Sequence, residues 1–215
     1  MNKETKYPDD YVDKIICGDC LEVIKGIPDR AVDLVLTDPP YGVYVDYGMG
    51  IEDNQDNLII LVNKIMPEIL RVSKRALITT GVLNAYHYPT PDWVLAWTNM
   101  AGANSSRWGF SCWQPILAYG KDPYLQFGKG RTHDVIPHNE TAGRVNHPCP
   151  KPDKFWEKLL LRGSVHEGDI ILDPFLGSGT TAEACKLTHR HFIGIEINPD
   201  YCKIAEDRLR QGVLT

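Results

Sequence analysis

The chain has 215 residues, 43% of them hydrophobic, and a formal net charge of −5, which is unfavourable for a protein that holds nucleic acid by charge alone. Its length suits one sizeable core with room for a small insert, and no apolar stretch approaches the length of a membrane span. The first residues carry no signal-peptide core and six cysteines do not indicate a disulfide framework, so we expect a cytoplasmic protein that does not associate with membranes.

Strands and helices alternate along the chain. Short apolar runs and stretches of helical spacing, each bounded by turn residues, distinguish the two kinds of element. Strands are predicted at 13–19, 31–37, 75–81, 111–121, 169–173 and 191–196. Helices are predicted at 20–28, 58–74, 153–163, 177–188 and 199–211. This alternation predicts an α/β fold with a mainly parallel sheet and helices on both faces.

Four segments depart from this regularity. Pro67 lies inside the second helical stretch and predicts a kink or break there. Residues 42–57 contain three glycines and no periodicity, which indicates a mobile loop, and residues 91–97 are predicted to begin a helix or a helix–strand corner. Residues 121–150 have no convincing period and are rich in Gly, Pro, His and basic residues, which is typical of a binding insert.

Acidic residues stand where four of the predicted strands end: Asp19, Asp38, Asp173 and Glu196. Ligands of open parallel sheets bind beyond the carboxyl ends of the strands, so these carboxylates are candidates for one site. Asp also suits ordinary turns, which is the alternative for each position taken alone.

The first of two motifs is "DPPY", from Asp38 to Tyr41. Prolines fix the backbone angle φ and remove amide donors, so Pro39 and Pro40 make a rigid turn whose carbonyl groups are free to accept hydrogen bonds. A plain strand-ending turn would explain the same residues, and the rest of the chain has to decide.

The second motif is "DPFLGSGT", where a strand ends in Asp173 and Gly177 and Gly179 open a helix. Glycines let the backbone approach a ligand, and the next strand ends in Glu196, twenty-three residues after Asp173, where an acid can bind ribose hydroxyls. Together these features predict a site for a nucleotide-type cofactor.

The cysteines allow two other interpretations. Cys17 and Cys20 form a CxxC, but the remaining cysteines give no second closely spaced pair, so we expect buried or partly buried thiols and no metal. Cys149 follows a proline, as in enzymes that methylate cytosine at C5 through a thiol, yet "DPPY" is the stronger catalytic candidate.

The motifs together resemble the S-adenosylmethionine-dependent amino methyltransferases of DNA. The resemblance rests on "DPPY" at 38–41, "DPFLGSGT" at 173–180, "GIE" at 194–196, the block "GDCLEVIKGIPDRAVDLVLTDPPYG" and "HPCPKP" at 147–152. The catalytic motif precedes the glycine loop, as in the permuted β class of this family. The resemblance implies a circularly permuted Rossmann-like methyltransferase fold, with residues 1–120 as catalytic half, 121–150 as a short target-recognition insert and 151–215 as cofactor-binding half.

The family also implies roles for particular residues. The catalytic turn would be Asp38, Pro39, Pro40 and Tyr41. S-adenosylmethionine would be held by Asp19, Cys20, Lys151, Pro152, Asp173, Phe175, Gly177, Ser178, Gly179, Thr180 and Glu196. Within these sets Glu196 would bind the ribose and Asp19 would face the adenine amine of the cofactor.

The chemistry of amine methylation gives the "DPPY" turn a purpose. The lone pair of an exocyclic base amine is delocalised into the ring, and Asp38 together with the Pro39 carbonyl can accept its two N–H groups and favour an attacking geometry. Tyr41 can stack on a base flipped out of double-stranded DNA. An Asp at the first position goes most often with N6 of adenine in the family, and N4 of cytosine is the alternative. Direct transfer requires no metal.

Target recognition is the part that the sequence predicts least. Lys129, Arg131 and Arg144 of the short insert are the candidate contacts to DNA. Because the insert is short, a second subunit, as in a homodimer, would be one way to complete recognition. An RNA methyltransferase, a nicotinamide-dependent oxidoreductase and a non-enzymatic nucleic-acid-binding module remain as less favoured alternatives.

Overall fold

A computed structural model describes residues 6–46, 52–100, 104–106, 108–139 and 151–211. The strands are β1 (Lys14–Cys17), β2 (Leu34–Thr37), β3 (Ala76–Thr79), β4 (Trp93–Thr98), β5 (Asn104–Ser106), β6 (Gly109–Ser111), β7 (Trp113–Tyr119), β8 (Val135–Pro137), β9 (Ile170–Asp173) and β10 (His191–Glu196). The helices are α1 (Cys20–Val23), α2 (Gln55–Val72), α3 (Pro123–Gln126), α4 (Asp153–Gly163), α5 (Thr180–Leu187) and α6 (Pro199–Gln211), with short 3-10 turns η1 (Ile24–Gly26) and η2 (Asn84–His87).

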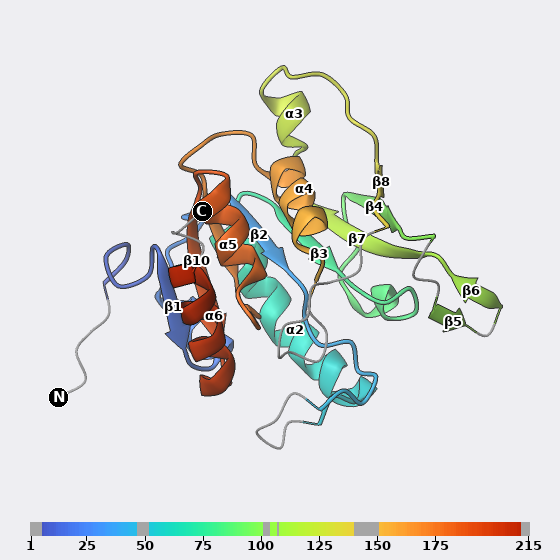
Figure 1. The fold of residues 1–215 in the computed structure, drawn as a ribbon, viewed down its shortest axis with the longest axis horizontal. Coiled ribbons are helices and arrows are strands. Elements are labelled where there is room, and N and C mark those ends of the chain that lie inside the picture. Colours follow the sequence, from blue (N-terminus) through green and yellow to red (C-terminus); the bar gives the residue numbers. More distant parts are fainter. Residues whose placement is uncertain (1–5, 47–51, 101–103, 107, 140–150, 212–215) are drawn as a thin grey trace.

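One sheet runs through the molecule in the strand order β1-β10-β9-β2-β3-β7-β4-β8 (Figure 1). The strands from β1 to β3 are mutually parallel, and β7 is antiparallel to both of its neighbours. The mainly parallel α/β sheet expected from the sequence is therefore confirmed.

Helices cover both faces of this sheet because the side chains of each buried strand alternate between them. On β2, Val35 joins a cluster with α1 and α2, whereas Leu34 and Leu36 join another with α4, α5 and α6. Figure 1 shows α4, α5 and α6 side by side over that second face. All four β2 residues are buried, which explains its continuous apolar sequence.

Two sequence predictions about local structure, a break of the helix at Pro67 and a helix that begins at 91–97, were wrong, whereas a kink at Pro67 stays a prediction. The helix α2 continues through Pro67, and its N-terminus is capped by the Asn54 side chain, which accepts a hydrogen bond from the amide of Asn57 at 2.9 Å. Residues 93–98 form β4 and not a helix, since Val94, Leu95 and Ala96 pair in antiparallel register with β7. Pairing across the sheet thus overrides the local pattern there.

The loop after the "DPPY" turn is ordered at both of its described ends. Asp53 is 4% exposed, and its carboxylate accepts hydrogen bonds from the amides of Gly42 at 2.6 Å, Val43 at 3.1 Å and Val45 at 3.2 Å. Residues 47–51 lie outside the described residues, so the mobile loop predicted for 42–57 stays a prediction for them.

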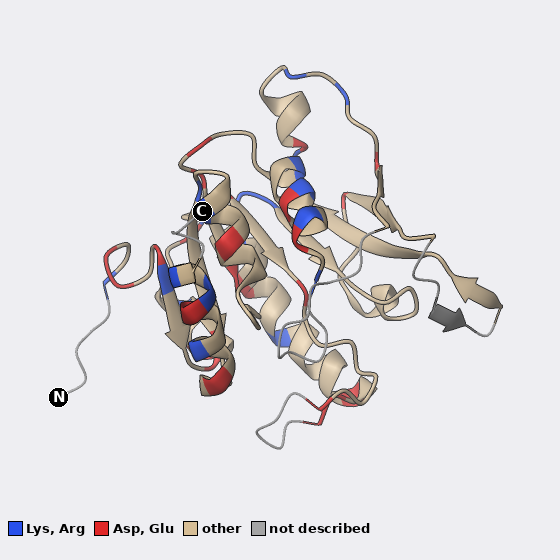
Figure 2. Cartoon of the chain, viewed as in Figure 1, with Lys and Arg blue, Asp and Glu red and all other residues tan. Residues whose placement is uncertain are grey.

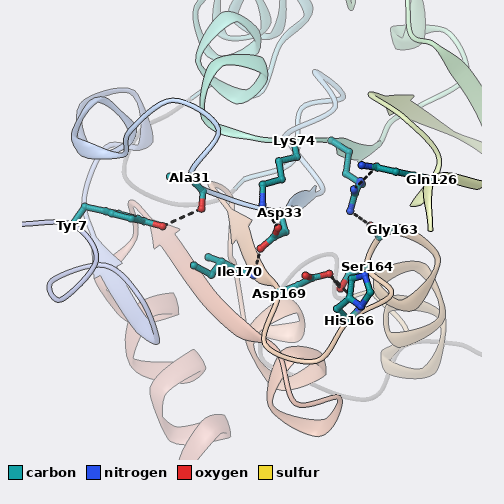
Figure 3. Close-up of polar contacts among 11 residues, drawn as sticks. Tyr7, Ala31, Asp33, Lys74, Gln126, Gly163, Ser164, His166, Asp169 and Ile170 are labelled. Atoms are coloured by element: carbon teal, nitrogen blue, oxygen red, sulfur yellow. Dashed lines mark hydrogen bonds and ion pairs between the residues drawn. The ribbon is translucent and has the colours of Figure 1, made fainter. Parts of the chain in front are cut away.

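Polar contacts fix the edge at which the parallel strands begin (Figure 3). Asp33, immediately before β2, accepts hydrogen bonds from the amide of Ile170 at 2.9 Å and from the Lys74 ammonium at 2.6 Å. At the same edge Gln126, at the end of α3, accepts a hydrogen bond from Arg75, just before β3, at 3.0 Å. These contacts hold the starts of β2, β3 and β9 in register.

The insert divides between the two edges of the sheet. Its first part, which includes α3, lies near the start of β3 and the C-terminal end of α4. Its later part includes β8, which pairs with β4 in parallel and runs toward the edge where β2 and β3 end. Residues 140–150 lie outside the described residues. The domain limits expected from the sequence stay a prediction.

The described residues bear on two classes of function. None of their helices combines the length and hydropathy needed to cross a bilayer. Within the same residues, His, Cys, Asp and Glu side chains form no group of three or more suited to a metal ion.

Candidate active site at the carboxyl edge of the sheet

The two sequence motifs meet because β2 and β9 are neighbours at the centre of the sheet. Leu34 pairs with Ile171 and Val35 with Leu172, so both strands end at the same edge. The chain leaves β9 toward β10 on one side and leaves β2 toward β3 on the other, which makes this a topological switch point. Asp38 and Asp173 therefore lie at the position where open α/β sheets bind ligands.

Asp38 accepts hydrogen bonds from three side chains. The Tyr41 hydroxyl donates to its Oδ1 at 2.6 Å, the Thr79 hydroxyl donates to the same oxygen, and the Lys151 ammonium donates to Oδ2. Burial, and then the nearby Asp38 carboxylate, raise the pKa of Tyr41 well above its usual value, so this hydroxyl remains a donor. The carboxylate is thus held from the end of β3 and from the residue before α4's N-cap.

The turn around Tyr41 is fixed from both sides. The Asn84 amide nitrogen, on η2, donates to the Tyr41 carbonyl oxygen, and the Asp53 carboxylate binds the amide of Gly42. Together with Pro39 and Pro40, these contacts leave little freedom to the backbone beside Asp38. The sequence predicted this rigidity from the prolines but not the contribution of Asn84 or Asp53.

Asp173 is 3% exposed and is enclosed by donors. Its Oδ1 accepts hydrogen bonds from the Thr37 hydroxyl at 2.6 Å and the Phe175 amide at 3.0 Å, and Thr181 donates to Oδ2. Burial raises the pKa of Asp173 to about 6, against the hydrogen bonds from Thr181 and Thr37, which lower it. This carboxylate therefore fixes the chain on both sides of the glycine loop, at Phe175 and at Thr181.

The glycine loop requires two residues without a side chain. Gly177 and Gly179 have φ angles of 55° and 90°, in the left-handed region that favours glycine. A Cβ on Gly179 would lie 2.8 Å from the Cβ of Ala205 on α6. Ser178 and Thr180, beside them, are buried. The lack of a side chain at Gly179, the N-cap of α5, therefore allows α6 to pack close to the turn, and the N-terminus of α5 is a position where a ligand's anionic group is favoured.

Glu196 supports this loop from the end of β10. It is 9% exposed, and its carboxylate accepts hydrogen bonds from the amides of Gly177 and Asn198, each at 2.8 Å. Four lone-pair sites on a carboxylate leave further acceptor capacity for a ligand hydroxyl. Ribose binding by Glu196 is compatible with this arrangement and stays a prediction.

The two CxxC thiols have different environments, since Cys20 is buried as expected whereas Cys17 is exposed. Asp19 caps α1 by accepting a hydrogen bond from the Leu21 amide at 2.9 Å, and its side chain is exposed at the same edge as Glu196, since Cys17 pairs with Glu196. Burial, followed by the Asp19 charge, raises the pKa of the Cys20 thiol to about 12. A thiol that stays protonated is a poor metal ligand or nucleophile.

The structure separates the predicted DNA contacts from this site. Lys129 donates to the Val165 carbonyl oxygen at 3.2 Å, beyond the C-terminal end of α4, and Arg131 lines a cavity of about 720 Å³ with Ala76, the first residue of β3. Both lie at the edge where the parallel strands begin, opposite Asp38. Arg144 lies outside the described residues. DNA binding by these three residues stays a prediction.

Three threonines of the site have no counterpart among the residues singled out from the sequence: Thr37, Thr79 and Thr181. Their signal was present, since Thr37 and Thr79 end buried strands and are themselves fully buried. A buried hydroxyl at a strand end needs an acceptor, and the adjacent carboxylates supply it.

Comparison with known proteins assigns the chain to a family. A family model for DNA methylases matches residues 93–207, slightly more than half of the chain. The DNA adenine methyltransferase YhdJ of Escherichia coli is 28% identical, with 91% of this chain and 82% of YhdJ covered. The chain belongs to the DNA methylase family, and is a DNA methyltransferase of the N6/N4 type.

Solved structures show the same fold. The cytosine-N4-specific PvuII DNA methyltransferase gives a TM-score of 0.70 at 16% identity, over 91% of this chain and 85% of that one. The M1.HpyAVI–SAM complex gives a TM-score of 0.66 at 24% identity, over 91% of this chain and 98% of that one. The Rossmann-like methyltransferase fold expected from the motifs is confirmed.

The raised pKa of Asp173 predicts a pH-dependent difference in stability between the wild type and Asp173→Asn. Between about pH 4 and 6 the Asp173 carboxyl is protonated in the folded protein but ionised in the unfolded protein. Its contribution to the free energy of unfolding therefore falls as pH rises through that window. Relative to the Asn variant, the wild type should lose roughly 2–3 kcal/mol between pH 4 and 7, since one pKa unit corresponds to about 1.4 kcal/mol. Urea denaturation at both pH values measures this, and a constant difference would contradict it.

Proposed function

We propose that the chain transfers a methyl group from S-adenosylmethionine to N6 of adenine in double-stranded DNA, with Asp38, Pro39, Pro40 and Tyr41 as the catalytic turn. The observation that carries the proposal is the common edge of β2 and β9, which brings the Asp38 turn beside the loop that contains Gly177 and Gly179. A site for an amine and a site for a nucleoside cofactor thus adjoin.

The residues of the carboxyl edge suit S-adenosylmethionine. The turn contains Gly177 and Gly179, both with positive φ, and a Cβ at Gly179 would meet Ala205. Glu196 has acceptor capacity for ribose hydroxyls, and Asp19 follows the end of the neighbouring strand β1, where it could bind the adenine amine. The other members of the proposed cofactor set are Cys20, Pro152, Asp173, Phe175, Ser178 and Thr180. Lys151, also expected in this set from the sequence, contacts Asp38. The bound cofactor supplies an electrophilic methyl group, so the protein needs to orient the amine and exclude water.

Asp38 would orient the target amine through its remaining acceptor site. A carboxylate has about four lone-pair sites, and Tyr41 and Thr79 both donate to Oδ1, so the capacity for the amine is on Oδ2, which the Lys151 ammonium also contacts. One N–H of the amine would donate to Oδ2 and the other to the Pro39 carbonyl, which directs the nitrogen lone pair away from both acceptors. On accepting the methyl group, whose bond to the cofactor sulfur would break to leave neutral S-adenosylhomocysteine, the amine would release its extra proton to solvent, without a covalent enzyme intermediate.

The preference for adenine rests on the residue at position 38 and on a relative. Asp at the start of this turn goes most often with adenine in the family, and YhdJ, similar over 91% of this chain, is named as an adenine methyltransferase. The PvuII enzyme, which shares the fold, is cytosine-N4-specific. N4 of cytosine is therefore the second candidate.

Mass spectrometry of digested plasmid DNA from cells that express the chain tests this function. We expect N6-methyladenine in the wild type and none with Asp38→Ala, because the amine loses the group that orients it. Asp38→Ala should still bind S-adenosylhomocysteine, and Asp200→Ala, an exposed acid on α6, should methylate normally. N4-methylcytosine would make the second candidate right, and an active Asp38→Ala enzyme would remove the mechanism.

A second part of the proposal concerns the surface that faces DNA. The strands β5 and β6 form a hairpin that continues β4 and β7 beyond the sheet, with the Asn99 amide bonded to the Cys112 carbonyl at 2.9 Å (Figure 1). Because Thr98 and Trp113 pair at the edge where β3 ends, this hairpin projects from the same edge that holds Asp38.

The composition of the hairpin suits a nucleic acid. Met100 is 70%, Trp108 100% and Phe110 77% exposed, which gives apolar and aromatic groups for bases. No Asp or Glu occurs between Asp92 and Asp122, although the chain contains 28 of them. Figure 2 shows β4, β6 and β7 without charged residues. We propose that this hairpin contacts the duplex near the flipped base.

Alanine variants distinguish the hairpin from the insert. Trp108→Ala and Phe110→Ala should each weaken DNA binding by roughly five- to a hundredfold, as loss of about 1–3 kcal/mol of stacking does. Trp93→Ala is the matched control, since Trp93 is 62% exposed but begins β4 at the opposite edge. Fluorescence anisotropy with labelled duplex measures the affinity.

The insert residues provide the contrary outcome. If Lys129→Ala and Arg131→Ala weaken binding while Trp108→Ala and Phe110→Ala do not, the duplex lies against the other edge and the hairpin proposal fails. Sedimentation of the same variants tests the homodimer: a dimer that dissociates with Trp108→Ala would assign the hairpin to a second copy of the chain.

A further inference from the structure

Lys151 occupies an unusual position in the site. Its ammonium donates to Oδ2 of Asp38 and lies 5.2 Å from the centroid of the Tyr41 ring, and its side chain is only 13% exposed. Asp38 and Tyr41 are also the two groups that a flipped base would use, one for its amine and one for its ring. The lysine therefore contacts both of them where the base would.

The number of acceptor sites on Asp38 makes the overlap specific. Oδ1 already accepts the Tyr41 and Thr79 hydroxyls, so the free capacity of the carboxylate is on Oδ2, which Lys151 contacts. An ammonium group over the ring face and a stacked base cannot share one space. A flipped base would thus meet Lys151 both at Oδ2 of Asp38, where its amine would bind, and at the face of the Tyr41 ring, where its own ring would stack.

Charge explains why a cation stands there in the absence of DNA. The Asp38 side chain is 20% exposed and lies near the buried carboxyl of Asp173, whose pKa it raises. A partly buried carboxylate beside a second acid is stabilised by an ion pair. Lys151 supplies it from the residue before Pro152, the N-cap of α4.

The geometry also allows the lysine to withdraw. Its backbone is adjacent to α4, which is anchored by the Trp156 amide bonded to the Pro152 carbonyl oxygen at 3.0 Å. Four methylene groups separate the ammonium from that backbone, so rotation about the side-chain bonds can move the charge without moving the helix.

We propose that the Lys151 ammonium is a positioning group that holds Asp38 and the Tyr41 face in the free enzyme and is displaced by the amine of the flipped base. The inference rests on the proposed function, because it takes the target amine to bind at Asp38. When the base binds, the neutral base amine then replaces the Lys151 ammonium as hydrogen-bond donor to Asp38. The lysine lowers the affinity for every base that lacks a well-placed amine, which contributes to selectivity.

Two substitutions at this position have opposite expected effects. Lys151→Met keeps the length of the side chain but removes its attraction to Asp38, so the base no longer competes with an ion pair. Lys151→Arg strengthens the competitor, because a guanidinium can bind a carboxylate through two N–H groups. Lys158→Met, an exposed lysine on α4, is the matched control for the loss of one positive charge.

The measurement is the dissociation constant of the protein for two unmethylated duplexes in the presence of S-adenosylhomocysteine. One duplex contains the sequence that the enzyme methylates, as identified by sequencing, and the other lacks it. For the site-containing duplex, Lys151→Met should bind roughly three- to tenfold more tightly and Lys151→Arg more weakly by a similar factor. For the duplex without the site, neither variant should tighten binding, because no base is flipped. Melting temperature with S-adenosylhomocysteine confirms that each variant is folded.

The outcomes separate this inference from the function on which it rests. If the wild-type chain methylates no DNA, the proposed function fails before the variants are compared. If it does, and both variants weaken binding of the site-containing duplex, Lys151 contacts the DNA or supports the turn and is not displaced. Unchanged affinity in both variants would equally overturn the proposal.

Discussion

The hydrogen bond from the Thr37 hydroxyl to the Asp173 carboxylate connects the two halves of the site. It joins the last residue of β2 to the last residue of β9, 136 positions later in the chain, at 2.6 Å. Thr37 immediately precedes Asp38, and Asp173 immediately precedes the turn toward Gly177. The position of Asp38, the proposed catalytic carboxylate, relative to the proposed cofactor loop therefore depends on one buried contact and on the pairing of β2 with β9 that allows it.

Two neighbouring carboxylates at this edge have different environments and different functions. Asp173 is enclosed by hydroxyl and amide donors, and burial raises its pKa to about 6. Asp38 is partly exposed and bound by the Lys151 ammonium, which we propose is displaced by the substrate amine. An enclosed acid is suited to shape a loop, whereas an acid with remaining acceptor capacity is suited to bind a substrate amine. The same residue type thus serves as scaffold and as proposed substrate ligand within one site.

The sequence predicted most of the fold because its strands and helices are strongly patterned. The run Leu34–Thr37 is buried on both faces, and the glycines at 177 and 179 have angles that other residues avoid. Such local signals do not depend on distant partners. They were sufficient to identify the strands on either side of the two motifs and hence the edge at which those motifs meet.

The remaining features depend on contacts between distant residues. Trp93–Thr98 becomes a strand because β7 pairs with it, and Thr37 and Thr79 join the site because a neighbouring strand presents a carboxylate. The insert looked suited to DNA from its composition, yet Lys129 and Arg131 lie at the opposite edge from Asp38. Which edge a loop reaches is determined by strand direction, and the antiparallel β7 could not be recognised from residue types alone.

The most direct test of this account is the effect of Thr37→Val and Thr37→Ser on two quantities, the affinity for S-adenosylhomocysteine by calorimetry and the single-turnover rate of DNA methylation. Thr37→Val should lower both, because the valine cannot donate to Asp173 and the two motifs lose their connection, while Thr37→Ser keeps the hydroxyl and both quantities. Thr79→Val removes a hydroxyl that donates to Asp38 and, more weakly at 3.4 Å, to the Thr37 carbonyl oxygen, but not to Asp173, so it should lower the methylation rate alone. Cofactor affinity and methylation rate of Thr37→Val equal to those of the wild type would contradict the central claim.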